Sequence, residues 1–218
     1  MSLQLYSYFR SSSAFRVRIA LNIKGLNYEY LPIHLLNNGG EQNSTDYKKL
    51  NPKAEVPLLL HDGKSISQSV AIIEYLDEAF PTPPLFPSDP YLKSQVRAAC
   101  EIINSGIQPL QNLRTLQKLE SDFAISEEQK VKWIIDWIHM GFYAYEQLIA
   151  KHAGPYSFGE QVTAADLFLV PQVYTAFRYN MTLENYPKIA EAYKNLSQLE
   201  AVIKGSPSQQ PDTPPELR

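Results

Sequence analysis

Hydrophobic and polar positions alternate with two different periods in the first 80 or so residues of the chain. The runs Leu3 to Ser7 and Tyr28 to Ile33 predict β-strands. Between them, apolar positions at helical spacing predict an α-helix that ends at Gly25. A strand, a helix and a second strand in this order predict a βαβ unit.

The rest of this region continues with short elements. Its pattern predicts a polar loop at 37–45 and a short helix at 46–50. The two strands of a hairpin follow at 57–60 and 65–66, and a longer helix at 68–80. Asp62-Gly63 supplies the hairpin turn. The order βαβ, α, ββα predicts a mixed sheet with helices on its faces, which is a thioredoxin-like arrangement.

After a proline-rich stretch, PTPPLFPSDP, the pattern becomes helical. Four helices are predicted, over 96–110, over 131–149, from a capping box at Thr163-x-x-Asp166 onwards, and over 188–204. Pro109 and Pro171 are expected to kink the first and the third. The fold class is therefore α+β. We expect a thioredoxin-like domain (1–80), a linker (81–90), an all-helical domain (91–205) and an extended proline-rich tail (206–218).

Composition excludes several classes of protein. The 218 residues fit one large domain or two small ones, and the net charge of −3, without a basic stripe, argues against nucleic-acid binding. A single cysteine, Cys100, excludes an internal disulfide, a CxxC pair and a thiolate-rich metal site. The four histidines are scattered, so we expect no metal centre.

The N-terminal residues contain no long apolar run of the kind found in a signal peptide. No apolar stretch reaches the ~18 residues of a membrane span. We therefore expect a soluble, cytoplasmic protein of a reducing compartment that has no membrane partner.

The generic catalytic motifs, such as Gly-rich phosphate loops, the GxSxG elbow and HExxH, are missing. One unusual cluster remains: Ser11, Ser12 and Ser13 follow the first strand and are preceded by Arg10. Hydroxyl groups beside the N-terminus of a helix form a place for an anion. Helix capping explains one serine equally well, and composition alone favours the cap.

A second strand-to-helix junction has similar chemistry. Gln68 and Ser69 open the helix at 68–80 with amide, hydroxyl and free N–H groups. Val56-Pro57 precedes the strand that leads there, and a cis bond would expose the Val56 backbone to a ligand. A helix cap and an edge-strand proline are, individually, the simpler interpretations.

Several strings in the sequence resemble zeta-class glutathione transferases, a family that includes maleylacetoacetate isomerases. The strings are YSYFRSSSAFRVRIALNIKG, NPKAEVPLLLHDGKSISQSVAIIEYL, SGIQPLQNLRTL, VTAADLFLVPQV and QPDTPPELR. The resemblance covers nearly the whole chain. It implies a glutathione-binding thioredoxin-like domain, an all-α domain and a homodimer.

Position by position, the resemblance implies that Ser11 hydrogen-bonds and activates the sulfur of glutathione, and that Ser12 and Ser13 share the catalytic and glutathione-binding site with it. It implies further glutathione contacts at Ala14, Phe15, Arg16, Gln42, Val56, Gln68, Ser69, Gln108, Asn112, Leu113 and Arg114. Arg178, with Arg10, would bind the carboxylates of a small, acidic, unsaturated substrate, because a guanidinium pairs with a carboxylate in bidentate fashion.

The sequence departs from the family at Ser13, where the usual residue is cysteine, and more mildly at Ala14 and Phe15. Since the implied nucleophile is the thiol of glutathione itself, the missing protein thiol affects side activities more than isomerisation.

The implied reaction converts 4-maleylacetoacetate into 4-fumarylacetoacetate, in phenylalanine and tyrosine catabolism, by thiolate addition, bond rotation and elimination. Two alternatives stay open: a transferase that acts on electrophiles such as α-halo acids, and a non-catalytic glutathione-binding module. A thiol–disulfide reductase is excluded because no cysteine precedes Cys100.

Overall fold

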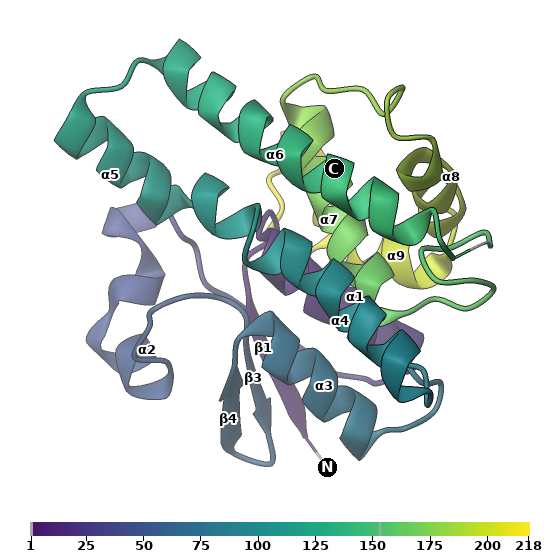
Figure 1. Cartoon of the computed structure of the whole chain (residues 1–218). Coiled ribbons are helices and arrows are strands. Elements are labelled where there is room, and N and C mark those ends of the chain that lie inside the picture. Colours follow the sequence, from purple (N-terminus) through teal and green to yellow (C-terminus); the bar gives the residue numbers. More distant parts are fainter. Residues whose placement is uncertain (1, 153) are drawn as a thin grey trace. The chain divides into compact units, whose positions relative to one another are not determined.

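The computed structural model describes residues 2–152 and 154–218 of the chain (Figure 1). The chain divides into two compact units. The first consists of Met1–Leu85 together with Gln198–Arg218, and the second of Phe86–Ser197. Among the described residues, no helix is long and apolar enough to cross a lipid bilayer.

A four-stranded mixed sheet with the order β2-β1-β3-β4 forms the centre of the first unit. The strands are β1 (Leu3–Ser7), β2 (Glu29–Pro32), β3 (Leu58–His61) and β4 (Lys64–Ser67). β1 pairs in parallel with β2 and antiparallel with β3, which in turn pairs antiparallel with β4. The predicted βαβ unit, hairpin and thioredoxin-like arrangement are confirmed.

Burial explains the sheet and the helix that crosses it. In the register of β1 and β3, Leu5 lies opposite Leu59, and neither side chain has exposed surface. A parallel pair of strands needs a crossover, which α1 (Ser12–Ile23) supplies between β1 and β2. α1 packs against α3 (Ser69–Ala79) and α9 (Glu200–Gly205), and eight consecutive residues of α1 are buried as a result.

The connections of the first unit are largely as expected. The predicted short helix is α2 (Thr45–Leu50), and the polar loop before it contains two 3-10 turns, η1 (Asn37–Gly39) and η2 (Glu41–Asn43). Asp62 and Gly63 join β3 to β4 with positive φ values of 48° and 79°, which is the conformation that a tight hairpin turn requires.

The C-terminal region departs from the prediction. Instead of one helix over 188–204, the chain forms α8 (Pro187–Leu196) in the second unit and α9 in the first. The helical domain therefore does not extend to residue 205. α9 lies so close to α1 that a Cβ atom on Gly205 would be 3.3 Å from the side chains of Ile19 and Phe15. The tail is not simply extended, since it contains η4 (Pro207–Gln209) and η5 (Pro215–Leu217).

The elements of the second unit are helices, as predicted. They are α4 (Pro90–Asn104), η3 (Gln108–Gln111), α5 (Leu113–Phe123), α6 (Glu127–Ile149), α7 (Ala164–Arg178) and α8. α4 and α8 each pack against both α6 and α7. The apolar residues at helical spacing on α4, which include Val96, Cys100 and Ile103, are buried and form core.

Two details of this unit differ from the prediction. Pro109 does not kink a long helix, because α4 already ends at Asn104 and Pro109 lies in the separate 3-10 helix η3. The helix α5 was not predicted. Its leucines, Leu113, Leu116 and Leu119, are only half-buried, so they do not form the wide apolar stripe by which α4 and α6 are recognised.

The capping box at the start of α7 is confirmed, and it includes a buried carboxylate. Asp166 Oδ2 accepts hydrogen bonds from the N–H (2.8 Å) and the hydroxyl (3.1 Å) of Thr163, while Oδ1 accepts one from the N–H of Ser157 (2.9 Å). Burial raises the pKa of Asp166, and these hydrogen bonds oppose that rise. Asp166 thus fixes the loop before α7 to the first turn of α7.

Asp166→Asn is expected to lower the free energy of unfolding by about 1–3 kcal/mol, because the new amide NH₂ points at one of the buried donors. Chemical denaturation followed by circular dichroism measures the loss. Glu160→Gln makes the same chemical change at an exposed position of the same segment and should leave the unfolding midpoint unchanged. Equal midpoints for the two variants would show that the Asp166 contacts do not stabilise the fold.

Candidate functional site

The turn between β1 and α1 presents Ser11 as the N-cap of α1. Its Oγ accepts a hydrogen bond from the N–H of Ala14 (3.2 Å), and its own N–H donates to the carbonyl oxygen of Tyr8 (3.0 Å). A hydroxyl has one proton to donate and two lone pairs that accept. The capping bond uses a lone pair and leaves the proton for another acceptor. Capping and anion binding are therefore compatible at Ser11.

The neighbours of Ser11 divide into two groups. Ser12 and Ser13 form the first turn of α1 and are half-buried, beside the positive end of the helix dipole. Ala14 and Phe15 are buried, with 0% and 2% exposure, so their side chains support the turn from the core. Whether these two residues also contact a ligand stays a prediction.

Arg16 links the two strand-to-helix junctions that the sequence singled out. Its side chain is 1% exposed, and Nη1 donates a hydrogen bond to the hydroxyl of Ser69 (3.1 Å). Ser69 is the first residue of α3, so the contact joins α1 to the N-terminus of α3. The structure therefore brings Arg16 and Ser69 together, although 53 positions separate them in the sequence.

Gln68 lies directly before α3 in a conformation that is uncommon for a residue with a side chain. Its φ is 72° and its ψ is 122°, and the residue is exposed. Such outliers cost about 1–3 kcal/mol each and cluster at functional sites. In the part of the chain that the structure describes, no side chain caps α3. Its first N–H groups therefore lack a side-chain acceptor, and such free groups at a helix N-terminus are able to bind an anion.

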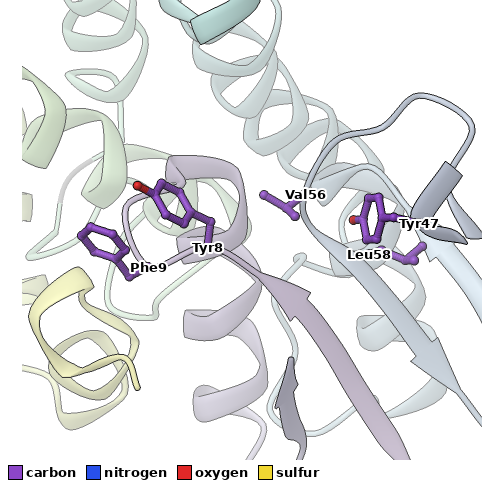
Figure 2. Packing of buried hydrophobic residues seen from close by; sticks show 5 residues of the cluster. All are labelled: Tyr8, Phe9, Tyr47, Val56 and Leu58. Carbon is purple, nitrogen blue, oxygen red and sulfur yellow. The ribbon is translucent and has the colours of Figure 1, made fainter. Parts of the chain in front are cut away.

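Val56 lies in the segment that leads into β3. The Val56–Pro57 peptide bond is cis, and Val56 is 9% exposed. Figure 2 shows it with the buried cluster that contains Tyr8, Phe9, Tyr47 and Leu58. Because Tyr8 and Phe9 follow β1 and Leu58 begins β3, this packing fixes the end of β1 against the segment that leads into β3.

Gln42 is held inside the loop before α2. It is 7% exposed, and its Nε2 lies 3.4 Å from the carbonyl oxygen of Leu35, which it faces as a donor. Among the described residues, Gln42 Oε1 has no hydrogen-bond partner although it is buried. Gly40, with a φ of 95°, lies so close that a Cβ atom there would be 2.4 Å from Gln42 Nε2. The hydrogen bond to Leu35 and the close approach of Gly40 both lie within the loop that contains Gln42.

The remaining predicted glutathione contacts belong to the second unit. Gln108 begins η3, and Asn112 is the N-cap of α5, where its Oδ1 accepts a hydrogen bond from the N–H of Arg114 (3.1 Å). Gln108, Asn112 and Leu113 are half-buried and Arg114 is exposed. Local chain geometry therefore brings these four residues together.

The two arginines predicted to bind substrate are each placed over an aromatic ring. Arg178 is exposed in the last turn of α7, and its guanidinium lies 6.0 Å from the centre of the Tyr179 ring. Arg10, in the first unit, is half-buried and lies 5.7 Å from the centre of the Phe9 ring. Within the second unit, a hydrogen bond from Gln111 Nε2 to Gln172 Oε1 (2.7 Å) ties η3 to α7.

The sequence analysis missed Arg18 and Asp212. Arg18 has no exposed surface, and Asp212, in the proline-rich tail, accepts a hydrogen bond from the N–H of Phe9 (2.9 Å). The only local signal was a basic residue among the apolar positions of the first predicted helix. No pattern near Asp212 indicated a contact 203 positions away.

Known families match both parts of the chain. Residues 1–78 match the glutathione S-transferase N-terminal domain and residues 117–204 match the glutathione S-transferase C-terminal domain. Maleylacetoacetate isomerase of Rattus norvegicus is 46% identical over 98% of this chain and 96% of its own. Glutathione S-transferase Z2 of Arabidopsis thaliana is also 46% identical, over 97% of this chain and 94% of its own.

Solved structures agree with these matches. The holo structure of maleyl pyruvate isomerase, a bacterial zeta-class glutathione S-transferase, has a TM-score of 0.93 and 41% identity, covering 97% of this chain and 100% of its own. Maleylacetoacetate isomerase from Anaeromyxobacter dehalogenans 2CP-1, with glutathione bound in its active site, has a TM-score of 0.88 and 39% identity over 98% of both chains.

Gly40→Ala is expected to destabilise the protein more than Gly39→Ala. Both glycines have a positive φ, so both variants carry backbone strain of about 1–2 kcal/mol. Only the Cβ atom at Gly40 meets the buried amide of Gln42, whereas the one at Gly39 has open space around it. The difference in urea midpoint between the two variants measures the cost of displacing Gln42 together with the extra strain at residue 40, whose φ of 95° and ψ of 115° lie outside the left-handed α region. Equal midpoints would show that Gln42 moves without cost.

Proposed function

Because the chain belongs to the zeta class of glutathione transferases, we propose that it is a glutathione-dependent isomerase that converts maleylacetoacetate into fumarylacetoacetate. The observation that carries the proposal is the placement of Ser11, whose hydroxyl caps α1 as an acceptor and keeps its proton for the sulfur of glutathione. Maleylacetoacetate isomerases and a zeta-class transferase share more than 40% of their sequence with the chain over nearly its whole length.

In this reaction the thiolate of glutathione adds to the cis double bond of the substrate. The new carbon–sulfur bond forms as the π electrons of the double bond move onto the conjugated carbonyl group, which becomes an enolate. The former double bond is then single and rotates. The enolate reforms the double bond in the trans geometry and expels the thiolate, so that glutathione returns unchanged.

The main energetic requirement is a thiolate at neutral pH. A free thiol has a pKa of about 8.5, and lowering it by about two units takes ~2.7 kcal/mol of preferential stabilisation of the anion. A hydroxyl that donates to a charged sulfur contributes about 1.5–3 kcal/mol, and a helix N-terminus about 0.3–1 kcal/mol. Ser11 and the first turn of α1 together meet this requirement without a metal ion or a protein base.

The rest of the first unit holds the tripeptide in this proposal. The γ-glutamyl carboxylate binds at the uncapped N-terminus of α3, beside Gln68 and Ser69, where free N–H groups and the helix dipole favour an anion. The Val56 backbone binds the cysteinyl amide, and Gln42 contacts the glycine end. Arg16 positions Ser69 through their hydrogen bond and adds a buried positive charge near both helix N-termini.

Ser12 and Ser13 complete the polar end of α1 in this proposal. The substrate is a dianion, and its carboxylates are assigned to the exposed Arg178 and the half-buried Arg10, because a guanidinium pairs with a carboxylate in bidentate fashion. Gln108, Asn112, Leu113 and Arg114, which all belong to the second unit, are assigned to contacts with glutathione.

We further propose that the protein is a cytoplasmic homodimer acting in phenylalanine and tyrosine catabolism. The exposed side chains of Met140 and Tyr143, which are 61% and 66% exposed one turn apart on α6, support an apolar contact with a second copy. Sedimentation velocity of the full chain tests the dimer.

Ser11→Ala is expected to lower kcat/KM for isomerisation of maleylacetone, an analogue of maleylacetoacetate, about 10- to 150-fold, as loss of a ~1.5–3 kcal/mol hydrogen bond to the thiolate predicts. Ser44→Ala is the matched control, because Ser44 caps α2 through the same Oγ-to-N–H contact (3.2 Å to Tyr47) and is assigned no contact with glutathione. It should cost similar stability and keep the rate.

Cys100→Ala should also keep the rate, since Cys100 is a buried core residue of the second unit. A rate no higher than that of glutathione alone would show that the chain is not this isomerase. Turnover of an α-halo acid would then indicate a transferase, and glutathione binding without either reaction would indicate a binding module.

Ser13→Cys, which restores the usual residue of the family, is expected to leave the rate of isomerisation largely unchanged and to make the enzyme sensitive to thiol reagents. The reason is that the nucleophile is supplied by glutathione, and a half-buried thiol at a helix N-terminus has a lowered pKa and reacts readily. Treatment with a disulfide reagent, followed by activity and mass measurement, tests this. A large gain in the reagent-free rate would show that residue 13 participates in the reaction.

A further inference from the structure

The C-terminal segment of the chain packs against the turn that carries Ser11. α9 and the residues after it, yellow in Figure 1, belong to the first unit together with β1 and α1. Side-chain hydrogen bonds fix the course of this segment. Gln210 Nε2 donates to the carbonyl oxygens of Lys204 and Ser206 (both 2.8 Å), and the hydroxyl of Thr213 donates to the carbonyl oxygen of Pro207. The segment is therefore an ordered support for its neighbours.

Asp212 connects this segment to the end of β1. Its Oδ2 accepts a hydrogen bond from the N–H of Phe9 (2.9 Å), and its Oδ1 accepts one from the hydroxyl of Tyr30 (2.7 Å). Burial raises the pKa of Tyr30, so this hydroxyl stays protonated and serves as a donor. Two donors, one in the turn after β1 and one in β2, thus fix both oxygens of one carboxylate.

Arg18 also binds the turn between β1 and α1, through backbone carbonyl groups. Its guanidinium donates to the carbonyl oxygens of Tyr8 (3.2 Å), Phe9 (2.9 Å) and Gly205 (2.8 Å). Burial lowers the pKa of Arg18 to about 10 while the negative charge of Asp212 opposes the shift, so the group stays charged at neutral pH. Both polar groups of the Phe9 backbone are therefore bound, the N–H by Asp212 and the C=O by Arg18.

These contacts lead directly to Ser11. The carbonyl oxygen of Tyr8, which Arg18 holds, also accepts the hydrogen bond from the N–H of Ser11 (3.0 Å). Any shift of Phe9 moves this turn and with it the direction of the Ser11 hydroxyl. Displacement of a reacting group by about 1 Å lowers a rate up to about 100-fold.

We propose that Asp212 is a positioning residue for Ser11, through which the C-terminal segment sets the hydrogen bond that Ser11 donates to the sulfur of glutathione. This inference rests on the proposed role of Ser11. The C-terminal segment, which lies far from Ser11 in the sequence, thereby helps to lower the pKa of the bound thiol.

The test is the apparent pKa of the thiol of bound glutathione, measured by the ultraviolet absorbance of the thiolate in full-length wild-type protein and variants. Asp212→Asn keeps the shape of the side chain but loses its charge and one acceptor. We expect the thiol pKa to rise toward that of free glutathione, and kcat/KM for maleylacetone at neutral pH to fall about 10- to 100-fold.

Thr213→Val is the matched control in the same segment. It removes the hydrogen bond to Pro207 and therefore destabilises the segment without touching the Phe9 backbone. We expect a lower unfolding midpoint with an unchanged thiol pKa. The proposal would be overturned if the thiol pKa shifted as much in Thr213→Val as in Asp212→Asn. It would also be overturned if the thiol pKa in Asp212→Asn equalled that in the wild-type protein.

Tyr30→Phe keeps the test available if Asp212→Asn does not fold. This variant leaves the carboxylate in place and removes one of its two donors, so it should raise the thiol pKa by a smaller amount in the same direction. An unchanged thiol pKa in Tyr30→Phe would then contradict the positioning role.

The thiol measurement separates the two proposals. Wild-type protein that lowers the thiol pKa without isomerising maleylacetone would refute the isomerase, while the comparison of variants would still decide the role of Asp212. Wild-type protein that does not lower the thiol pKa would overturn the role of Asp212 together with that of Ser11.

Discussion

A guanidinium group with no exposed surface, that of Arg18, organises the first unit. An isolated buried charge costs several kcal/mol, and burial is tolerated only when hydrogen bonds replace the lost water. Arg18 meets this condition with four bonds, to the carbonyl oxygens of Tyr8, Phe9 and Gly205 and to the hydroxyl of Ser7. The end of β1, the helix α1 that carries Arg18 and the last residue of α9 are consequently fixed around one group.

Hydrogen bonding also distinguishes the two helix N-termini of the candidate site. Ser11 caps α1 with a lone pair and retains its proton, whereas α3 begins after a strained Gln68 without a side-chain cap among the described residues. One terminus is thus already stabilised and still able to donate, and the other is left for an anion. Arg16 joins the two by binding Ser69, so the spacing between them is fixed from the core rather than from the surface.

Local sequence signals were sufficient for several elements that are defined by their own residues. The alternation in Leu3–Ser7, the Asp62-Gly63 turn and the capping box at Thr163 each have a local physical cause, and each is present. The serine cluster was visible for the same reason, since three hydroxyls at a strand-to-helix junction are a local pattern. Its chemical meaning came from the resemblance to a family, because capping alone explained one serine equally well.

The sequence by itself therefore determined the order of strands and helices in the first 80 residues, the helical character of most of the rest and the position of the serine cluster between the first strand and the first helix. Only the tertiary structure decided that the last residues, from Gln198 onwards, belong to the first unit, and that Arg18 and Asp212 enclose the turn before Ser11. The physical reason is distance along the chain: contacts between Phe9 and Asp212, 203 positions apart, leave no periodic signature, whereas helices and hairpins form between neighbours that the sequence displays side by side.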